Sequence, residues 1–188
     1  MYKFKKVNTN IDGLYIIEPN VRFDERGYFF EEYNRDEFLK LGLNMEFVQQ
    51  NESLSKKNVL RGLHVQKKHP QGKLVRVLTG EIYDVVVDLR ENSQTFGGWF
   101  GTILSSENFK QLYIPEGFAH GFFVKSEVAK ISFKVSDYWY PDNEIGIMWN
   151  DANLNIDWKL PKNVIPIITE KDSKYLPITE TVMKGFAK

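Results

Sequence analysis

The sequence contains no cysteine among its 188 residues, which excludes a disulfide framework and any thiolate metal site. It also lacks a net charge, because 25 Lys and Arg residues balance 25 Asp and Glu residues, so a broad basic surface for nucleic acid is not expected. No apolar run is long enough to span a bilayer, and no basic amphipathic helix stands out that could lie on one. Residues 1–6 show no apolar signal region. We therefore expect a cytoplasmic protein that binds neither nucleic acid nor a membrane.

Short apolar and aromatic segments are abundant instead, and aromatic residues make up 14% of the chain. Segments of β-branched and aromatic residues separated by Gly, Pro, Asn and Asp are typical of strands joined by turns. Strands are expected at residues 14–17, 28–33, 47–51, 59–66, 73–78, 81–89, 99–104, 111–114, 121–124 and 129–135. Many short strands at close spacing predict an all-β sandwich or barrel. The length favours a single domain over 1–188, with a loop-rich tail from about residue 141.

A few short helices are expected beside the strands, and one of them is well marked. Asn34 is a good N-cap, Glu37 occupies the capping-box position three residues later, and Gly42 supplies a stop. This helix is expected to pack on the outside of a sheet.

The strands at 73–78 and 81–89 are expected to form a hairpin through Thr79 and Gly80. Both faces of the second strand are largely apolar, which is typical of a strand covered on both sides. Asp84 lies within that strand and is therefore expected to point at a polar group in the interior.

Polar chemistry is concentrated on the strands between residues 59 and 76, where Arg61, His64, Gln66 and Lys73 have Val and Leu as neighbours. Histidine can move protons near neutral pH, and a nearby lysine can neutralise a developing oxyanion, so His64 and Lys73 together suit the enolisation of a carbonyl compound. The alternative is a histidine hydrogen-bonded in a core and a solvated lysine.

Two other histidines are present. His69 falls in the turn KKHP and is expected to be solvated. His120 enters a strand between small and aromatic residues, where a structural role is usual, but it would face the same interior as His64.

Seven motifs occur in order along the chain: FDERG at 23–27, FVQQN at 47–51, LRGLH at 60–64, QGKLVRV at 71–77, VDLR at 87–90, IPEGFAHGF at 114–122 and EKD at 170–172. In sequence and spacing they resemble the dTDP-4-dehydrorhamnose 3,5-epimerase family over about residues 14–172. The resemblance implies a cupin-like jelly-roll barrel, a homodimer with strand exchange, and no cofactor. It also implies a nucleotide-linked sugar as the substrate and a place in the synthesis of activated rhamnose and related deoxysugars.

The same resemblance assigns roles to individual residues. His64 would be the base that removes the proton beside the C4 ketone, Asp172 the carboxylate that holds its imidazole, and Lys73 the cation that stabilises the enolate oxygen. Substrate binding would fall to Arg26, Phe29, Glu31, Gln49, Asn51, Arg61, His120, Trp139, Glu144 and Lys171. Of these, Arg26 and Glu31 match residues that the family lends to the partner subunit's site, and Trp139 matches the aromatic residue that stacks on the thymine.

One position departs from the family. The expected general acid is a tyrosine, and Phe133 stands in its place with no proton to give. Tyr138 and Tyr140 are possible substitutes, although strand alternation does not direct them where Phe133 points.

These observations favour a cofactor-independent epimerase that acts at C3, C5 or both carbons of a nucleotide-linked 4-keto-6-deoxyhexose, with dTDP as the expected nucleotide. Epimerisation at C3 only is the alternative that Phe133 raises. A metal-dependent cupin oxygenase would need His64 and His120 as ligands, but His64-Val65-Gln66 provides one imidazole where such sites commonly have a His-x-His pair, so no metal site is expected. A non-catalytic sugar-nucleotide binding module is the third possibility.

Overall fold

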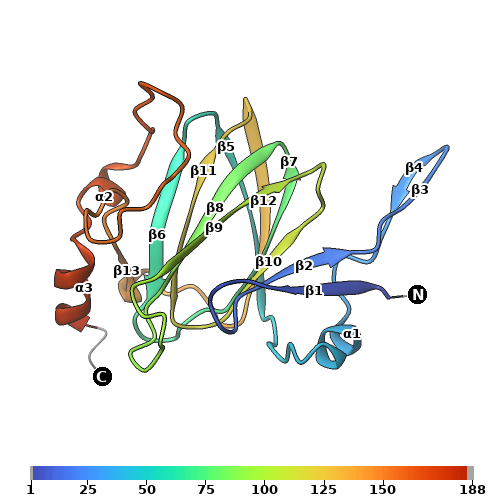
Figure 1. Ribbon diagram of the computed structural model, residues 1–188, viewed down its shortest axis with the longest axis horizontal. Coiled ribbons are helices and arrows are strands. Elements are labelled where there is room, and N and C mark those ends of the chain that lie inside the picture. The colour runs from blue at the N-terminus through green and yellow to red at the C-terminus, as the bar shows by residue number, and fades with distance from the viewer. Residues whose placement is uncertain (1, 186–188) are drawn as a thin grey trace.

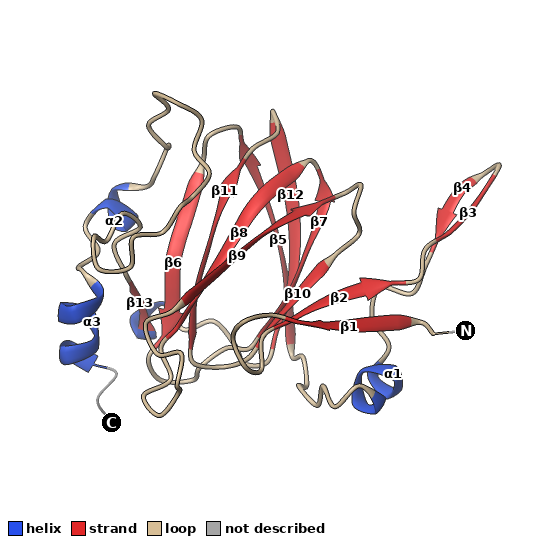
Figure 2. Ribbon diagram, viewed as in Figure 1, coloured by secondary structure: helices blue, strands red, loops and turns tan. Residues whose placement is uncertain are grey.

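The computed structural model describes residues 2–185, and two antiparallel sheets packed face to face form its body (Figure 1, Figure 2). One sheet has the strand order β1 (Phe4–Asn8), β2 (Tyr15–Pro19), β10 (Gln111–Ile114), β7 (Lys73–Thr79), β12 (Val128–Val135) and β5 (Gln49–Lys56). The other has the order β13 (Glu144–Gly146), β6 (Leu60–Gln66), β11 (Phe118–Val124), β8 (Glu81–Asp88) and β9 (Trp99–Ser105). The all-β fold class predicted from the strand spacing is confirmed. Both ends of the predicted domain, residues 1 and 188, lie outside the described residues.

Strand β8 separates the two main hydrophobic clusters. Its residues Ile82 and Val86 pack with Val75 and Ile131 in the cluster between the two sheets. On the opposite face of the strand, Tyr83, Val85 and Val87 pack in a second cluster, to which the tail contributes Trp158. Coverage on both faces is what the apolar pattern of this strand predicted.

The predicted hairpin of 73–78 with 81–89 is wrong, because β7 and β8 belong to different sheets. Thr79 is paired with Lys130 of β12, whereas Glu81 is paired with Ser105 of β9. Gly80, at φ +80°, turns the chain from one sheet into the other. A short turn containing glycine can connect two strands of a hairpin, and it can equally lead the chain from one sheet into another. The burial of both faces of β8 decides which strands it pairs with.

Three α-helices are present among the described residues. Helix α1 (Arg35–Lys40) begins as predicted, since the Asn34 side chain accepts a hydrogen bond from the Glu37 backbone N–H. Helix α2 (Glu170–Ser173), α3 (Ile178–Gly185) and the short 3-10 helix η1 (Pro141–Asn143) lie in the tail. None of the described helices is both long and apolar enough to cross a membrane.

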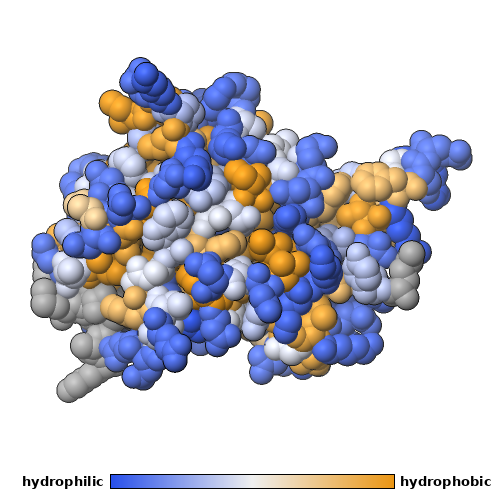
Figure 3. All heavy atoms as spheres, in the orientation of Figure 1, coloured by the Kyte–Doolittle hydropathy of each residue, from blue (hydrophilic) through white to orange (hydrophobic). Residues whose placement is uncertain are grey.

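A two-stranded arm, β3 (Arg22–Asp24) with β4 (Gly27–Phe29), projects from the barrel on the side opposite the tail (Figure 1). The strand expected at 28–33 is therefore only the short second strand of this arm. Phe23 and Phe29 are 70% and 71% exposed. Figure 3 shows hydrophobic surface along the arm and a hydrophilic tip. Such exposure of large apolar side chains is typical of a surface that meets another molecule.

Candidate active site

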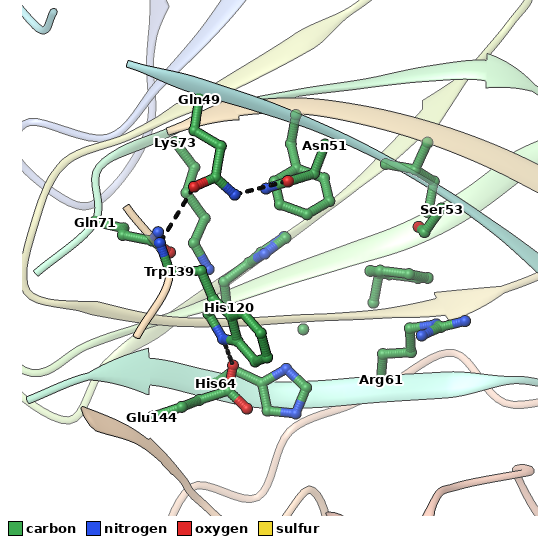
Figure 4. Close-up of a pocket in the computed structure, with 14 residues that line it drawn as sticks. Gln49, Asn51, Ser53, Arg61, His64, Gln71, Lys73, His120, Trp139 and Glu144 are labelled. Carbon is green, nitrogen blue, oxygen red and sulfur yellow. Dashed lines mark hydrogen bonds between the residues drawn. The ribbon is translucent and has the colours of Figure 1, made fainter. Parts of the chain in front are cut away.

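A cavity of about 290 Å³ opens between the two sheets (Figure 4). Concave sites with a few converging polar groups are where small molecules bind. The lining residues are Gln49, Asn51, Ser53, Arg61, His64, Gln71, Lys73, His120, Gly121, Phe122, Ile131, Phe133, Trp139 and Glu144.

His64 on β6 is held by Asp172 of α2, with His64 Nε2 2.9 Å from Asp172 Oδ1. The Gly62 N–H donates to the other carboxylate oxygen, and the Thr169 hydroxyl caps the helix that carries Asp172. Burial opposes ionisation of Asp172, but the His64 contacts and the Gly62 hydrogen bond hold the pKa of this carboxyl below its usual range. An ionised acceptor fixes the proton of neutral His64 on Nε2 and leaves the Nδ1 lone pair free to take a proton.

His120 on β11 forms a second histidine–carboxylate pair. Its Nε2 lies 2.9 and 3.0 Å from the two oxygens of Asp84, which is fully buried on β8. The expectation that Asp84 points at an interior polar group is therefore confirmed. His120 is also the direct cross-strand partner of His64, so the two imidazoles lie side by side on one wall of the cavity.

The backbones of β6 and β11 approach unusually closely beside these histidines. A Cβ atom on Gly62, whose φ is +109°, would lie 2.6 Å from the Gly121 Cα. A Cβ on Gly121 would lie 2.7 Å from the Arg61 carbonyl oxygen and 3.2 Å from the Trp158 ring. Only glycine fits at both positions.

Lys73 reaches the cavity from β7 in the opposite sheet (Figure 4). Burial lowers the pKa of Lys73 to about 8, against the opposing influence of Glu144 and Asp84. Lysine of this kind is charged at neutral pH and still able to give up a proton.

Neutral polar groups line the same wall as Lys73. Gln49, Asn51 and Ser53 occupy alternate positions of β5, and the Gln49 amide donates to Asn51 Oδ1 at 2.8 Å. Ser53 and Gln71 were not among the predicted site residues. Strand alternation could have predicted both of them. Each lies two positions from a predicted site residue on an extended segment, and the two residues therefore share a face.

Trp139 and Glu144 line the cavity near its mouth. The Trp139 indole N–H donates to Glu144, and the Lys171 ammonium pairs with the same carboxylate. Burial opposes ionisation of Glu144, yet Lys171, His64 and Trp139 lower its pKa. Trp139 is 51% exposed, so it is not part of the core.

Arg61 projects into the cavity from β6, three residues before His64. Its Nε donates to the Ser55 hydroxyl at 3.0 Å. No hydrogen bond or ion pair within the described residues occupies its two terminal nitrogens. A guanidinium held in this way can bind an anionic ligand with its two terminal nitrogens.

Phe133 contributes only a hydrocarbon ring to the cavity wall. Tyr138 and Tyr140, the possible substitutes for the missing acid, do not line the cavity. The Tyr140 ring packs on the ring of His69 with centroids 4.5 Å apart, and the side chain of Tyr138 is exposed. His69 is half exposed, as a solvated turn residue should be, and also contacts Asp137 at 3.2 Å.

Tyr175 is a neighbour of His64 that the sequence did not reveal. Its ring meets the His64 ring edge to face, with centroids 5.7 Å apart, and covers Gly146, where a Cβ would clash with it. The Tyr175 hydroxyl is buried without a hydrogen-bond partner among the described residues. No local pattern marks this contact, because it depends on how the tail folds back on β6.

Arg26, Phe29 and Glu31 lie away from the cavity. Arg26 forms an exposed ion pair with Asp24 at the arm, and Glu31 pairs with Lys3. These three predicted binding residues do not reach the cavity of their own chain. Lys171 does not line the cavity itself, but it pairs with Glu144, which does.

Residues 2–185 contain no group of three or more His, Cys, Asp or Glu side chains arranged to hold a metal ion. His64 and His120 each bond to a separate carboxylate instead.

Comparison with known proteins agrees with the geometry. A family model described as dTDP-4-dehydrorhamnose 3,5-epimerase matches residues 8–180. The dTDP-4-dehydrorhamnose 3,5-epimerase of Methanothermobacter thermautotrophicus is 49% identical over 96% of this chain and 97% of its own length. The crystal structure of the enzyme of that name from Elizabethkingia anophelis has a TM-score of 0.90 and 50% identity, covering 95% of this chain and 98% of that one.

A further neighbour was solved with a ligand. It is dTDP-6-deoxy-D-glucose-3,5-epimerase from Legionella pneumophila in complex with dTDP-4-keto-L-rhamnose, with a TM-score of 0.90 and 47% identity over 94% of this chain and 93% of that one. The cupin-like fold that the motifs implied is thereby confirmed. The chain belongs to the dTDP-4-dehydrorhamnose 3,5-epimerase family.

Proposed function

We propose that the protein epimerises a dTDP-linked 4-keto-6-deoxyhexose at the carbons beside its ketone, in the synthesis of rhamnose-type sugars and without a cofactor. The observation that carries the proposal is the histidine–carboxylate pair of His64 and Asp172 facing Lys73 across one cavity. A charged nucleotide sugar as substrate fits the cytoplasmic location expected from the sequence.

His64 acts as the base. Its Nδ1 takes the proton from the carbon beside the ketone, the electrons move to the carbonyl oxygen, and Asp172 stabilises the imidazolium that forms. The Lys73 ammonium neutralises the enolate oxygen. A hydrophobic ring at Phe133 helps to exclude water from this charge.

The nucleotide end binds through charge and stacking. The free terminal nitrogens of Arg61 hold phosphate, Lys171 beside Glu144 adds a second cation, and the exposed ring of Trp139 stacks on the base. Gln49, Asn51 and His120 hydrogen-bond the sugar.

The arm acts in a homodimer, reaching from one protomer to the cavity of its partner. Arg26, Phe29 and Glu31 would then complete the binding site of the other copy. Support comes from the exposure of Phe23 and Phe29 and from the projection of the arm away from its own cavity (Figure 1).

Inversion at C3 alone is the second candidate, favoured by Phe133. Inversion requires a donor on the face opposite the base, and a phenyl ring cannot be one. A site with weakened donation can exchange protons at both carbons yet invert only one.

The test is incubation with dTDP-4-keto-6-deoxyglucose in heavy water, with the C3 and C5 protons followed by NMR. Loss of both signals together with a changed ring configuration supports the 3,5-epimerase, and configuration changed at C3 only supports the second candidate. Binding of the sugar nucleotide with neither signal lost would instead make the protein a binding module and contradict the proposal.

A further inference from the structure

The two walls of the cavity differ in the protons that they can move. The five-stranded sheet contributes His64 from β6, His120 from β11 and Glu144 from β13. The six-stranded sheet contributes the neutral polar side chains of β5, the apolar Ile131 and Phe133 of β12, and Lys73 of β7. Among the described lining residues, Lys73 is thus the one acid–base group on the wall that faces His64.

Strand register places Lys73 beside the apolar part of that wall. Phe133 is paired with Val75, which lies two residues from Lys73 on β7 and shares its face. Figure 4 shows the Lys73 side chain extending toward the level of His120 from the side opposite His64. A sugar ring between the sheets would therefore present one face to His64 and the other to Lys73.

Inversion of a carbon requires that the proton leave from one face and return to the other. His120 lies on the same wall as His64, and its Nε2 is occupied by Asp84, so it is badly placed for the second step. Resting on the proposed function, we propose that the Lys73 ammonium delivers the proton to the carbon on the face opposite His64.

The step balances without any further reactant. The carbon–hydrogen bond on the His64 face breaks, and its proton goes to Nδ1 while the electron pair forms the enolate. One N–H bond of Lys73 then breaks, a carbon–hydrogen bond forms on the opposite face, and the ketone is restored. His64 is left protonated and Lys73 neutral, and solvent returns each to its starting state.

Burial supports this role, because it lowers the pKa of Lys73 to about 8. An ordinary lysine has a pKa of about 10.4 and is therefore a weak acid at neutral pH. General acids work best with a pKa near the operating pH.

The ratio of the inversion rate to the deuterium-exchange rate distinguishes two roles for Lys73, stabilising the enolate and donating the proton. Exchange needs only His64 and an enolate, whereas inversion also needs the opposite donor. If Lys73 only stabilises the enolate, Lys73→Met slows both processes equally. If Lys73 is the donor, Lys73→Met lowers the ratio by about a hundredfold.

The decisive set is the unmodified protein, Lys73→Met, Phe133→Tyr and the double variant Lys73→Met/Phe133→Tyr, followed by NMR in heavy water. Lys130→Met is the matched control, because Lys130 pairs with Glu52 on the outer surface of β12. We expect the ratio to fall in Lys73→Met, to stay unchanged in Lys130→Met, and to recover at least about tenfold in the double variant, whose added phenol supplies a donor on the same wall.

The pH dependence of the unmodified protein provides a second measurement that needs no variant. Lys73 is a donor only below its pKa, so the ratio should fall as pH rises through about 8, and in Phe133→Tyr that fall should move to higher pH. A ratio that is independent of pH and unchanged in Lys73→Met would overturn the donor role while leaving the proposed function intact. Absence of exchange in the unmodified protein would overturn the proposed function itself.

Discussion

The cavity contains two histidine–carboxylate pairs whose histidines lie side by side on the neighbouring strands β6 and β11, yet the pairs differ in how they are built. Asp84 lies on the strand next to His120 and is fully buried. Asp172 is separated from His64 by 108 residues and arrives on a helix of the tail. The His64 side chain is 28% exposed and that of His120 only 10%. The His64–Asp172 pair is therefore accessible to ligand and solvent and can take up and release protons. The His120–Asp84 pair is more buried and holds the cavity wall in place.

His64→Ala should have the largest effect, because it removes the base altogether. Proton exchange beside the ketone should fall by about a hundredfold or more, with unfolding temperature nearly unchanged, and NMR in heavy water measures it. His69→Ala is the matched control, since that histidine lies outside the cavity lining. Exchange at the original rate in His64→Ala would place the base elsewhere.

Asp172→Asn tests whether the distant carboxylate gives the first pair its chemistry. The amide can keep the hydrogen bond from His64 but cannot balance the imidazolium charge, so exchange should fall by roughly a hundredfold. Asp157→Asn, at an exposed ion pair, should leave the rate unaltered. An equal loss in both variants would argue against a specific role for Asp172.

Asp84→Ala should mainly reduce the stability of the fold, whereas the two preceding variants should mainly reduce proton exchange. Removing this carboxylate leaves the buried Nε2 of His120 without its partner, which costs about 1–3 kcal/mol. Denaturant unfolding measures the change. If Asp84→Ala kept its full stability and lost proton exchange by about a hundredfold, the two pairs would not differ in role as described.

Trp139→Ala should have the smallest effect and should leave both pairs intact. The ring is half exposed at the cavity mouth, so its removal should weaken dTDP binding by about tenfold with little change in unfolding temperature. Calorimetric titration with dTDP measures the affinity. Unchanged affinity with a large drop in unfolding temperature would mean that Trp139 is a packing residue.

Local patterns were sufficient to predict much of the fold. Asn34 and Glu37 predicted the start of α1 because a cap is made within one turn. The apolar character of both faces of β8 predicted its burial, and Asp84 within that strand was expected to meet a polar partner, which is His120. Each of these predictions was drawn from a pattern of residues close together in sequence.

Long-range features were beyond such reasoning. The turn at Gly80 could serve a hairpin or a corner, and only the pairing of β8 with β9 decides between them. The contact of Tyr175 with His64 depends on the path of the tail, and the pairing of Asp172 with His64 came from family resemblance alone. Strand pairing and tail packing, which depend on residues far apart in the sequence, determine these contacts.

The close approach of Gly62 and Gly121 has a consequence for how tolerant this protein is to random substitution. Neither residue has a functional group, yet an added carbon at either would push apart the two strands that carry His64 and His120. A saturation-mutagenesis map would therefore mark both glycines as being as intolerant as the histidines, and selection for activity would not separate the two kinds of position. The intolerance at the glycines would report a lack of space, and that at His64 a lack of chemistry.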